Sequence, residues 1–109
     1  IDWQGAQQVR QLLPDSAWVF ILPPSIAALK TRLQNRAQDN ADTIEVRMRA
    51  ARDEMSHWHE ADYLIINDNF DSALEELRAL VRSLRLRTDQ QQSTLHDFIY
   101  DLLLSADRK

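Results

Sequence analysis

The sequence predicts an α/β fold in which helices cover a sheet of parallel strands. Two short apolar runs, residues 17–22 and 63–66, are rich in strand-favouring side chains and end at prolines or at Asn and Asp. Continuous apolar runs of this length are typical of strands that are buried on both faces. The segments around them have apolar residues three and four positions apart, which indicates amphipathic helices. This order suits a parallel sheet with right-handed crossovers.

The first third of the chain contains a strand end, a helix and a complete strand. Apolar and polar residues alternate over 1–4, which is typical of the end of a strand. A helix follows over about 6–13 and stops before a proline. After the strand at 17–22, Ser25 can cap a helix that ends near Asn35.

A polar connection over 36–41 leads to a second helix, which begins at Asn40 or Asp42. Apolar residues three and four positions apart form one face of this helix, and charged residues lie off that face. The apolar face comprises Ile44, Met48, Ala51, Met55 and Trp58. We expect it to contribute to a packed core.

The last third contains one strand and two helices. The second apolar run is a buried strand, and Asp71 or Ser72 can cap the helix that follows, which reaches about Leu86. Residues 88–93 are polar and rich in glutamine, so we expect a connection there. A final helix over about 95–105 restores the helical spacing of apolar residues.

Composition narrows the range of functions. The net charge of −4 argues against generic nucleic-acid binding through a basic surface. Cysteine is absent, which excludes disulfides and zinc–thiolate sites, and Gly5 is the only glycine, although loops that wrap phosphates need several. No apolar run approaches the roughly 18–20 residues that span a bilayer. We therefore expect a cytoplasmic protein without nucleic-acid or membrane partners.

Three arginines form the first candidate site. Arg32 and Arg36 are four positions apart on one predicted helix, and Arg47 follows a short connection that can fold it over the same place. Converging arginines suit phosphate, because the planar guanidinium binds phosphate oxygens in pairs and stays charged at physiological pH. Arginines with this spacing are more often solvated or paired with carboxylates, so the spacing alone leaves both interpretations open.

Asn67 is a second candidate, because it directly follows the predicted strand 63–66. Ligands of open parallel sheets bind beyond the carboxyl ends of the strands, where an amide can recognise a purine edge. A turn or helix cap is the commoner role for Asn in this position. His57 and His59 are two positions apart on a predicted helix and so point in different directions, and we predict no metal site there.

Three stretches resemble bacterial guanylate kinases, together with the arginine spacing between them. The stretches are IDWQGAQQVRQLLPDS, FILPPS and MSHWHEADYLIINDNFDSAL, and the resemblance covers nearly the whole chain. It implies the fold of P-loop nucleoside monophosphate kinases and transfer of the γ-phosphoryl group of Mg-ATP to GMP. It also implies that residues 1–109 are the C-terminal part of the family's domain, with a helical lid over about 32–48 and C-terminal helices over about 70–105.

The same resemblance implies a role for each candidate residue. Arg32, Arg36 and Arg47 match the lid arginines that close over the ATP phosphates. Asn67 matches the residue that contacts adenine, and Asp2 matches an aspartate on the GMP side of the cleft. The family commonly has glycines around the second lid arginine, which this sequence lacks, so we expect less freedom at the lid hinge.

The phosphate-binding loop and the GMP-binding domain of the family would precede residue 1, and Mg²⁺ would be held mainly by residues outside this chain. Because the first residue is not methionine, we expect a fragment that uses GMP and ATP within a complete enzyme and is inactive alone. Exposed sheet edges would favour self-association, so a homo-oligomer is also considered. The alternative is a non-catalytic guanylate-kinase-like interaction module, against which the three retained arginines argue.

Overall fold

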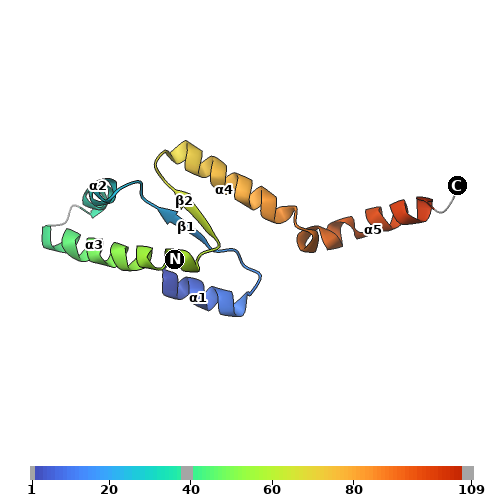
Figure 1. The fold of residues 1–109 in the computed structure, drawn as a ribbon, viewed down its shortest axis with the longest axis horizontal. Coiled ribbons are helices and arrows are strands. Elements are labelled where there is room, and N and C mark those ends of the chain that lie inside the picture. Colours follow the sequence, from blue (N-terminus) through green and yellow to red (C-terminus); the bar gives the residue numbers. More distant parts are fainter. Residues whose placement is uncertain (1, 38–40, 107–109) are drawn as a thin grey trace. The chain divides into compact units, whose positions relative to one another are not determined.

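The computed structural model describes residues 2–37 and 41–106, whose ribbon is drawn in Figure 1. The chain divides into two units, 1–73 and 74–109, and the candidate site residues all belong to the first. In chain order the elements are α1 (Trp3–Leu12), β1 (Val19–Leu22), α2 (Ile26–Ala37), α3 (Ala41–Ser56), the 3₁₀ turn η1 (Trp58–Glu60), β2 (Tyr63–Ile66), α4 (Phe70–Arg85) and α5 (Thr88–Ala106).

The two strands pair in parallel, in a register that runs from Val19 opposite Tyr63 to Leu22 opposite Ile66. The ladder extends past both ends of the strands. The Tyr63 N–H donates to the Trp18 carbonyl over 3.1 Å, and the Asn67 N–H donates to the Leu22 carbonyl over 2.8 Å. The connection between the strands runs through α2 and α3, which contact each other (Figure 1). The predicted α/β fold with parallel strands is therefore confirmed.

The predicted apolar face of α3 supplies much of the core. Ile44 and Met48 are buried, with exposed fractions of 7% and 4%, and Ile65 of β2 is buried at 5%. Trp58 was expected on the same face but is 51% exposed. The reason is that α3 ends at Ser56 and the chain tightens into η1, which turns Trp58 off the helical stripe.

The start of the chain departs from its prediction. Residues 1–4 were expected to end a strand, but α1 begins at Trp3 and Asp2 is its N-cap; Ile1 lies outside the described residues. The Asp2 carboxylate accepts from the Gly5 N–H over 2.7 Å, and the Asp2 carbonyl accepts from the Ala6 N–H over 2.9 Å. The bond to Gly5 satisfies an N–H group that a helix start otherwise leaves unpaired, and the bond to Ala6 is the first regular hydrogen bond of the helix. Together they begin a helix where the alternation predicted the end of a strand.

The helix pair that links the strands has nearly the predicted bounds. α2 continues two residues beyond Asn35, and α3 begins at Ala41, between the two predicted start positions. Ser25 caps α2 as predicted, because its hydroxyl accepts from the Ala28 N–H over 3.0 Å. Residues 38–40 of the predicted connection lie outside the described residues.

The starts of the last two helices, α4 and α5, also differ from prediction. The cap of α4 is Asn69 rather than Asp71 or Ser72, because the Asn69 side-chain oxygen accepts from the Ser72 N–H over 3.2 Å. α5 begins at Thr88, so the glutamine-rich segment 88–93 is helical and not a connection. Glutamine is a good helix former, which explains why this polar segment continues the helix. Within the described ranges, no helix is long and apolar enough to span a membrane.

The buried position of Met48 yields a stability prediction. In the full-length protein, we expect Met48→Ala to lower the free energy of unfolding by about 2–5 kcal/mol, because the lost side chain leaves a cavity in the core. Urea unfolding measures this change. The control is Val46→Ala on the same helix, where the side chain is 63% exposed, and its effect should stay within about 0.5 kcal/mol. Equal effects of the two changes would contradict the assigned core.

Candidate functional site

Arg32 and Asn67 meet at the carboxyl end of the sheet. The Arg32 Nη2 donates to the Asn67 backbone carbonyl over 2.8 Å, although the two residues are 35 positions apart. The Asn67 N–H is bonded to Leu22, so its backbone is anchored to both the neighbouring strand and the crossover helix. Arg32 is exposed and Asn67 is half-buried. The structure thus brings together a predicted phosphate-binding residue and the predicted base-contacting residue.

The other two arginines lie on the same pair of helices. Arg36 is four residues after Arg32 on α2, and its side chain lies outside the described part of the chain. Arg47 is an exposed residue of α3. Because α2 and α3 contact each other, all three arginines belong to one helical pair that connects the strands. Convergence of the three guanidinium groups on a single ligand stays a prediction.

Asp2 lies on a separate part of the first unit, beside a cavity of about 590 Å³. The lining residues come from the start of α1, from β1 and the segments that flank it, and from α2 and α3. They are Asp2, Trp3, Trp18, Val19, Phe20, Ile21, Pro23, Leu29, Ala51, Glu54 and Met55. Most of the lining is apolar, and the two carboxylates belong to Asp2 and Glu54. Leu29 is three residues before Arg32, so the cavity extends to α2, which carries Arg32 and Arg36.

Sequence reasoning missed Glu54, which binds the start of α1. The Trp3 N–H donates to its carboxylate, over 3.1 Å to Oε2 and 3.4 Å to Oε1. The Trp3 ring stacks on the ring of His57, with ring centres 3.7 Å apart and planes at 13°. No motif in the sequence marks Glu54, because its partner is 51 positions away. His57 therefore has one aromatic and one carboxylate neighbour.

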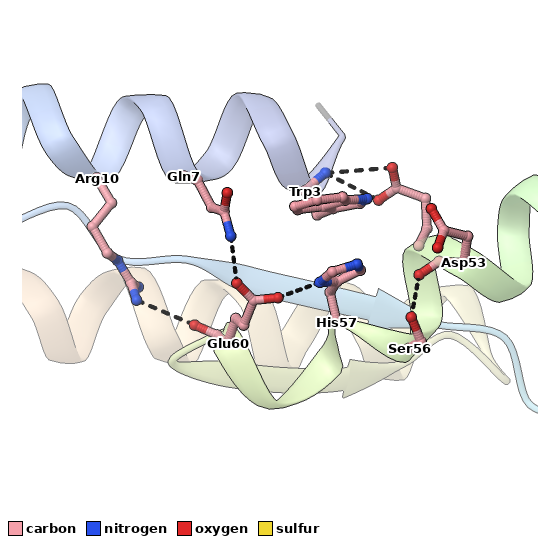
Figure 2. Close-up of polar contacts among 8 residues, drawn as sticks. Trp3, Gln7, Arg10, Asp53, Ser56, His57 and Glu60 are labelled. Atoms are coloured by element: carbon pink, nitrogen blue, oxygen red, sulfur yellow. Dashed lines mark hydrogen bonds and ion pairs between the residues drawn. The ribbon is translucent and has the colours of Figure 1, made fainter.

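Glu60 joins α1 to η1 through its two carboxylate oxygens, as Figure 2 shows. The Gln7 side-chain amide donates to Oε1 over 2.6 Å, and the His57 Nδ1 contacts Oε2. An ionised carboxylate only accepts, so Nδ1 of His57 carries the proton in this contact. The hydrogen bond from Gln7 and then that from His57 lower the pKa of Glu60 below its ordinary value of 4.5. Burial opposes these bonds, and the charges of His57 and His59 lower the pKa by smaller amounts.

A second set of contacts holds the C-terminal half of α1. The Arg10 guanidinium donates to the Glu60 carbonyl over 3.1 Å and forms an ion pair with Asp62. Asp62 also accepts from the Trp18 N–H over 2.9 Å, and the Arg10 guanidinium carbon lies 5.4 Å from the centre of the Trp18 ring. These contacts tie α1 to the segments that precede β1 and β2. Within 2–37 and 41–106, no group of three or more His, Cys, Asp or Glu side chains is arranged to hold a metal ion.

Comparison with known proteins defines the class. The structure resembles the crystal structure of guanylate kinase from Anaplasma phagocytophilum, with a TM-score of 0.67 and 26% sequence identity over 83% of this chain and 41% of that one. The chain is therefore an α/β protein of the P-loop nucleoside monophosphate kinase class.

Sequence relatives identify the family within that class. Guanylate kinases from Methylobacillus flagellatus and Shewanella oneidensis are 56% and 52% identical to this chain over 103 residues each, which is 94% of it. The family model described as guanylate kinase matches residues 1–84. The chain belongs to the guanylate kinase family. It spans about half the length of the relatives it matches, 51% and 50% in these two cases.

The Glu60 contacts yield a prediction about pH. Because the folded-state pKa lies below 4.5, the carboxylate stabilises the fold above about pH 4.5, and this contribution is lost as the pH falls through the folded-state pKa. Gln7→Ala removes the largest cause of the shift. We therefore expect the pKa of Glu60, followed by NMR titration of its carboxyl carbon, to rise toward 4.5 in this variant. The neighbouring exposed Gln8→Ala should leave it unchanged; an equal rise there would contradict the role of Gln7.

Proposed function

We propose that the full-length protein containing this chain is a guanylate kinase, which transfers the γ-phosphoryl group of ATP to GMP in cytoplasmic purine nucleotide metabolism. The observation that carries the proposal is the hydrogen bond between Arg32 and the Asn67 carbonyl. This bond joins an arginine of α2, in the connection between the strands, to the loop that follows β2. Nucleotides bind beyond the carboxyl ends of the strands in open α/β sheets, which is where this loop lies. The relatives at 50% identity or more, which are named guanylate kinases, support the same activity.

Arg32, Arg36 and Arg47 act in this proposal as lid residues over the ATP phosphates, in a lid that comprises about 32–48. Phosphoryl transfer is catalysed chiefly by positioning and charge stabilisation, which suits arginines. The exposed Arg32 guanidinium bonds a neutral carbonyl, and hydrogen bonds to an ionised phosphate are roughly twice as strong as neutral ones. Arg32 can therefore exchange the Asn67 carbonyl for a phosphate oxygen when ATP binds.

Asn67 contacts adenine in this proposal, and Asp2 contacts GMP. The hydrogen bonds that support Asn67 use its backbone N–H and carbonyl, which leaves the side-chain amide for the base. An amide suits adenine because it donates and accepts at once. Asp2 bonds Gly5 through Oδ1, and a carboxylate has about four lone-pair sites on two oxygens. Its second oxygen can therefore accept a hydrogen bond from GMP at the cavity that Asp2 lines.

Mg²⁺ would accompany ATP and neutralise charge on its phosphates. Mg²⁺ is usually held by one or two carboxylates together with substrate phosphates and waters. In this proposal those carboxylates belong mainly to residues outside this chain. The helices over about 70–105 form the C-terminal part of the domain in this proposal, and self-association through open sheet edges is a further expectation.

The activity is tested with a coupled assay of ADP release. We expect the full-length protein to release ADP only when both ATP and GMP are present. A protein that consists of residues 1–109 alone should show no turnover, since its single glycine cannot build a phosphate-binding loop. GMP-dependent ADP release by residues 1–109 alone would contradict this assignment. A full-length protein that binds a partner protein and never phosphorylates GMP would instead be the interaction module.

The role of Asn67 is tested by the choice of phosphate donor. In the full-length protein, Asn67→Leu should raise the KM for ATP and reduce the preference for ATP over GTP about tenfold, because unpaired polar groups on the base cost about 1–3 kcal/mol. The backbone bonds to Leu22 and Arg32 do not depend on the side chain. The exposed neighbour offers the control Asp68→Ala, which should keep the preference. An unchanged preference in Asn67→Leu would make Asn67 a turn residue only.

A further inference from the structure

Two carboxylates from distant parts of the chain hold the N-terminus of α1. Asp2 accepts from the Gly5 N–H over 2.7 Å, and Glu54 of α3 accepts from the Trp3 N–H over 3.1 Å. The first N–H groups of a helix have no partner within the helix, and the helix dipole favours negative charge at this end. Glu54 therefore attaches the helix start to α3 at the residue that directly follows Asp2.

The Trp3 ring fixes the same point from a second direction. It stacks on His57 with ring centres 3.7 Å apart, and His57 in turn contacts the Glu60 carboxylate that accepts from Gln7 (Figure 2). The backbone of Trp3 is thus bonded to α3, and its side chain is packed on the residue that follows α3. With Trp3 held in this way, the backbone of Asp2 has little freedom to turn.

We propose that Glu54 is a positioning residue for GMP, which acts by orienting Asp2 toward the substrate. This inference rests on the proposed function, and in particular on the assignment of Asp2 to GMP. Asp2 and Glu54 both line the cavity of about 590 Å³, so the residue that Glu54 orients borders the same space as Glu54. Glu54 itself is committed to the Trp3 N–H through both of its oxygens, whereas Asp2 uses one.

The alternative roles of Glu54 make different predictions. A residue that only stabilises the fold would affect the use of GMP and ATP equally when removed. A residue that binds GMP directly would contribute independently of Asp2. Removal of a positioning residue would raise the KM for GMP and leave the KM for ATP unchanged. This effect would disappear once Asp2 can no longer bind GMP, because the free energies of interacting residues are not additive.

The experiment uses four variants of the full-length protein: Glu54→Ala, Asp2→Asn, the double variant, and the matched control Asp53→Ala. Asn caps helices as well as Asp does, so Asp2→Asn removes the charge and keeps the helix start. Asp53 is an exposed acid next to Glu54, and its contact with Ser56 uses the backbone carbonyl. KM for GMP, KM for ATP and kcat are measured, together with hydrogen exchange at the Gly5 amide and the thermal midpoint of unfolding.

We expect Glu54→Ala to raise the KM for GMP about tenfold and to change the KM for ATP less than twofold. Asp2→Asn should raise the KM for GMP by a similar factor. The KM for GMP of the double variant should exceed that of Asp2→Asn by less than twofold. Exchange at the Gly5 amide should accelerate about tenfold in Glu54→Ala and stay unchanged in Asp53→Ala. If Glu54→Ala does not fold, Glu54→Gln replaces it in the test. We then expect the KM for GMP to rise about threefold and the KM for ATP to stay unchanged.

The inference would be overturned by equal rises in KM for GMP and ATP, by additive effects of Glu54→Ala and Asp2→Asn, or by unchanged exchange at the Gly5 amide. Wild-type turnover of GMP separates the inference from the proposed function. If the wild type phosphorylates GMP but Glu54→Ala does so with an unchanged KM, the kinase assignment stands and the positioning role is wrong. A wild type that never uses GMP overturns both.

Discussion

The parallel pairing of β1 with β2 is the constraint on which the first unit depends. Parallel strands cannot be joined by a tight turn, so the chain must cross over, and here α2 and α3 form that connection. The register ends both strands at the same edge, with Leu22 opposite Ile66. At this edge the Asn67 carbonyl accepts a hydrogen bond from the Arg32 guanidinium. The contact between Arg32 and the loop that follows β2 is therefore a consequence of strand topology.

The opposite end of the unit depends on polar contacts more than on apolar burial. α1 contributes one buried residue, Ala6, to the core. Its attachment instead uses Glu54, His57 and Glu60, together with the contacts of Arg10. Partly exposed ion pairs and hydrogen bonds each contribute little stability, but several of them together restrict the orientation of a helix. Asp2, the N-cap of α1, is therefore held in a defined orientation although α1 buries only one residue.

The residues that follow α3 have a structural role that their local sequence does not indicate. His57 and His59 suggest a metal pair when read as a motif, and their positions two apart argue against it. In the structure, His57 packs flat on Trp3 and contacts Glu60, and these contacts give it a role in attaching α1. The ring serves as a flat packing surface and as a hydrogen-bond donor, and both uses need a partner from another part of the chain.

Local patterns determined what the sequence could predict. The strand 63–66, the buried positions Ile44 and Met48, and the cap at Ser25 all follow from side chains within a few positions of one another. Helical spacing and position after a strand made Arg32 and Asn67 candidates, and the family resemblance added a role for each of them in ATP binding. Only the tertiary structure decided that Asp2 begins a helix held by Glu54, and that Gln7 and Glu60 form a bond across 53 positions. A hydrogen bond between distant residues leaves no periodicity in the sequence, because its geometry exists only after the intervening helices and strands have packed.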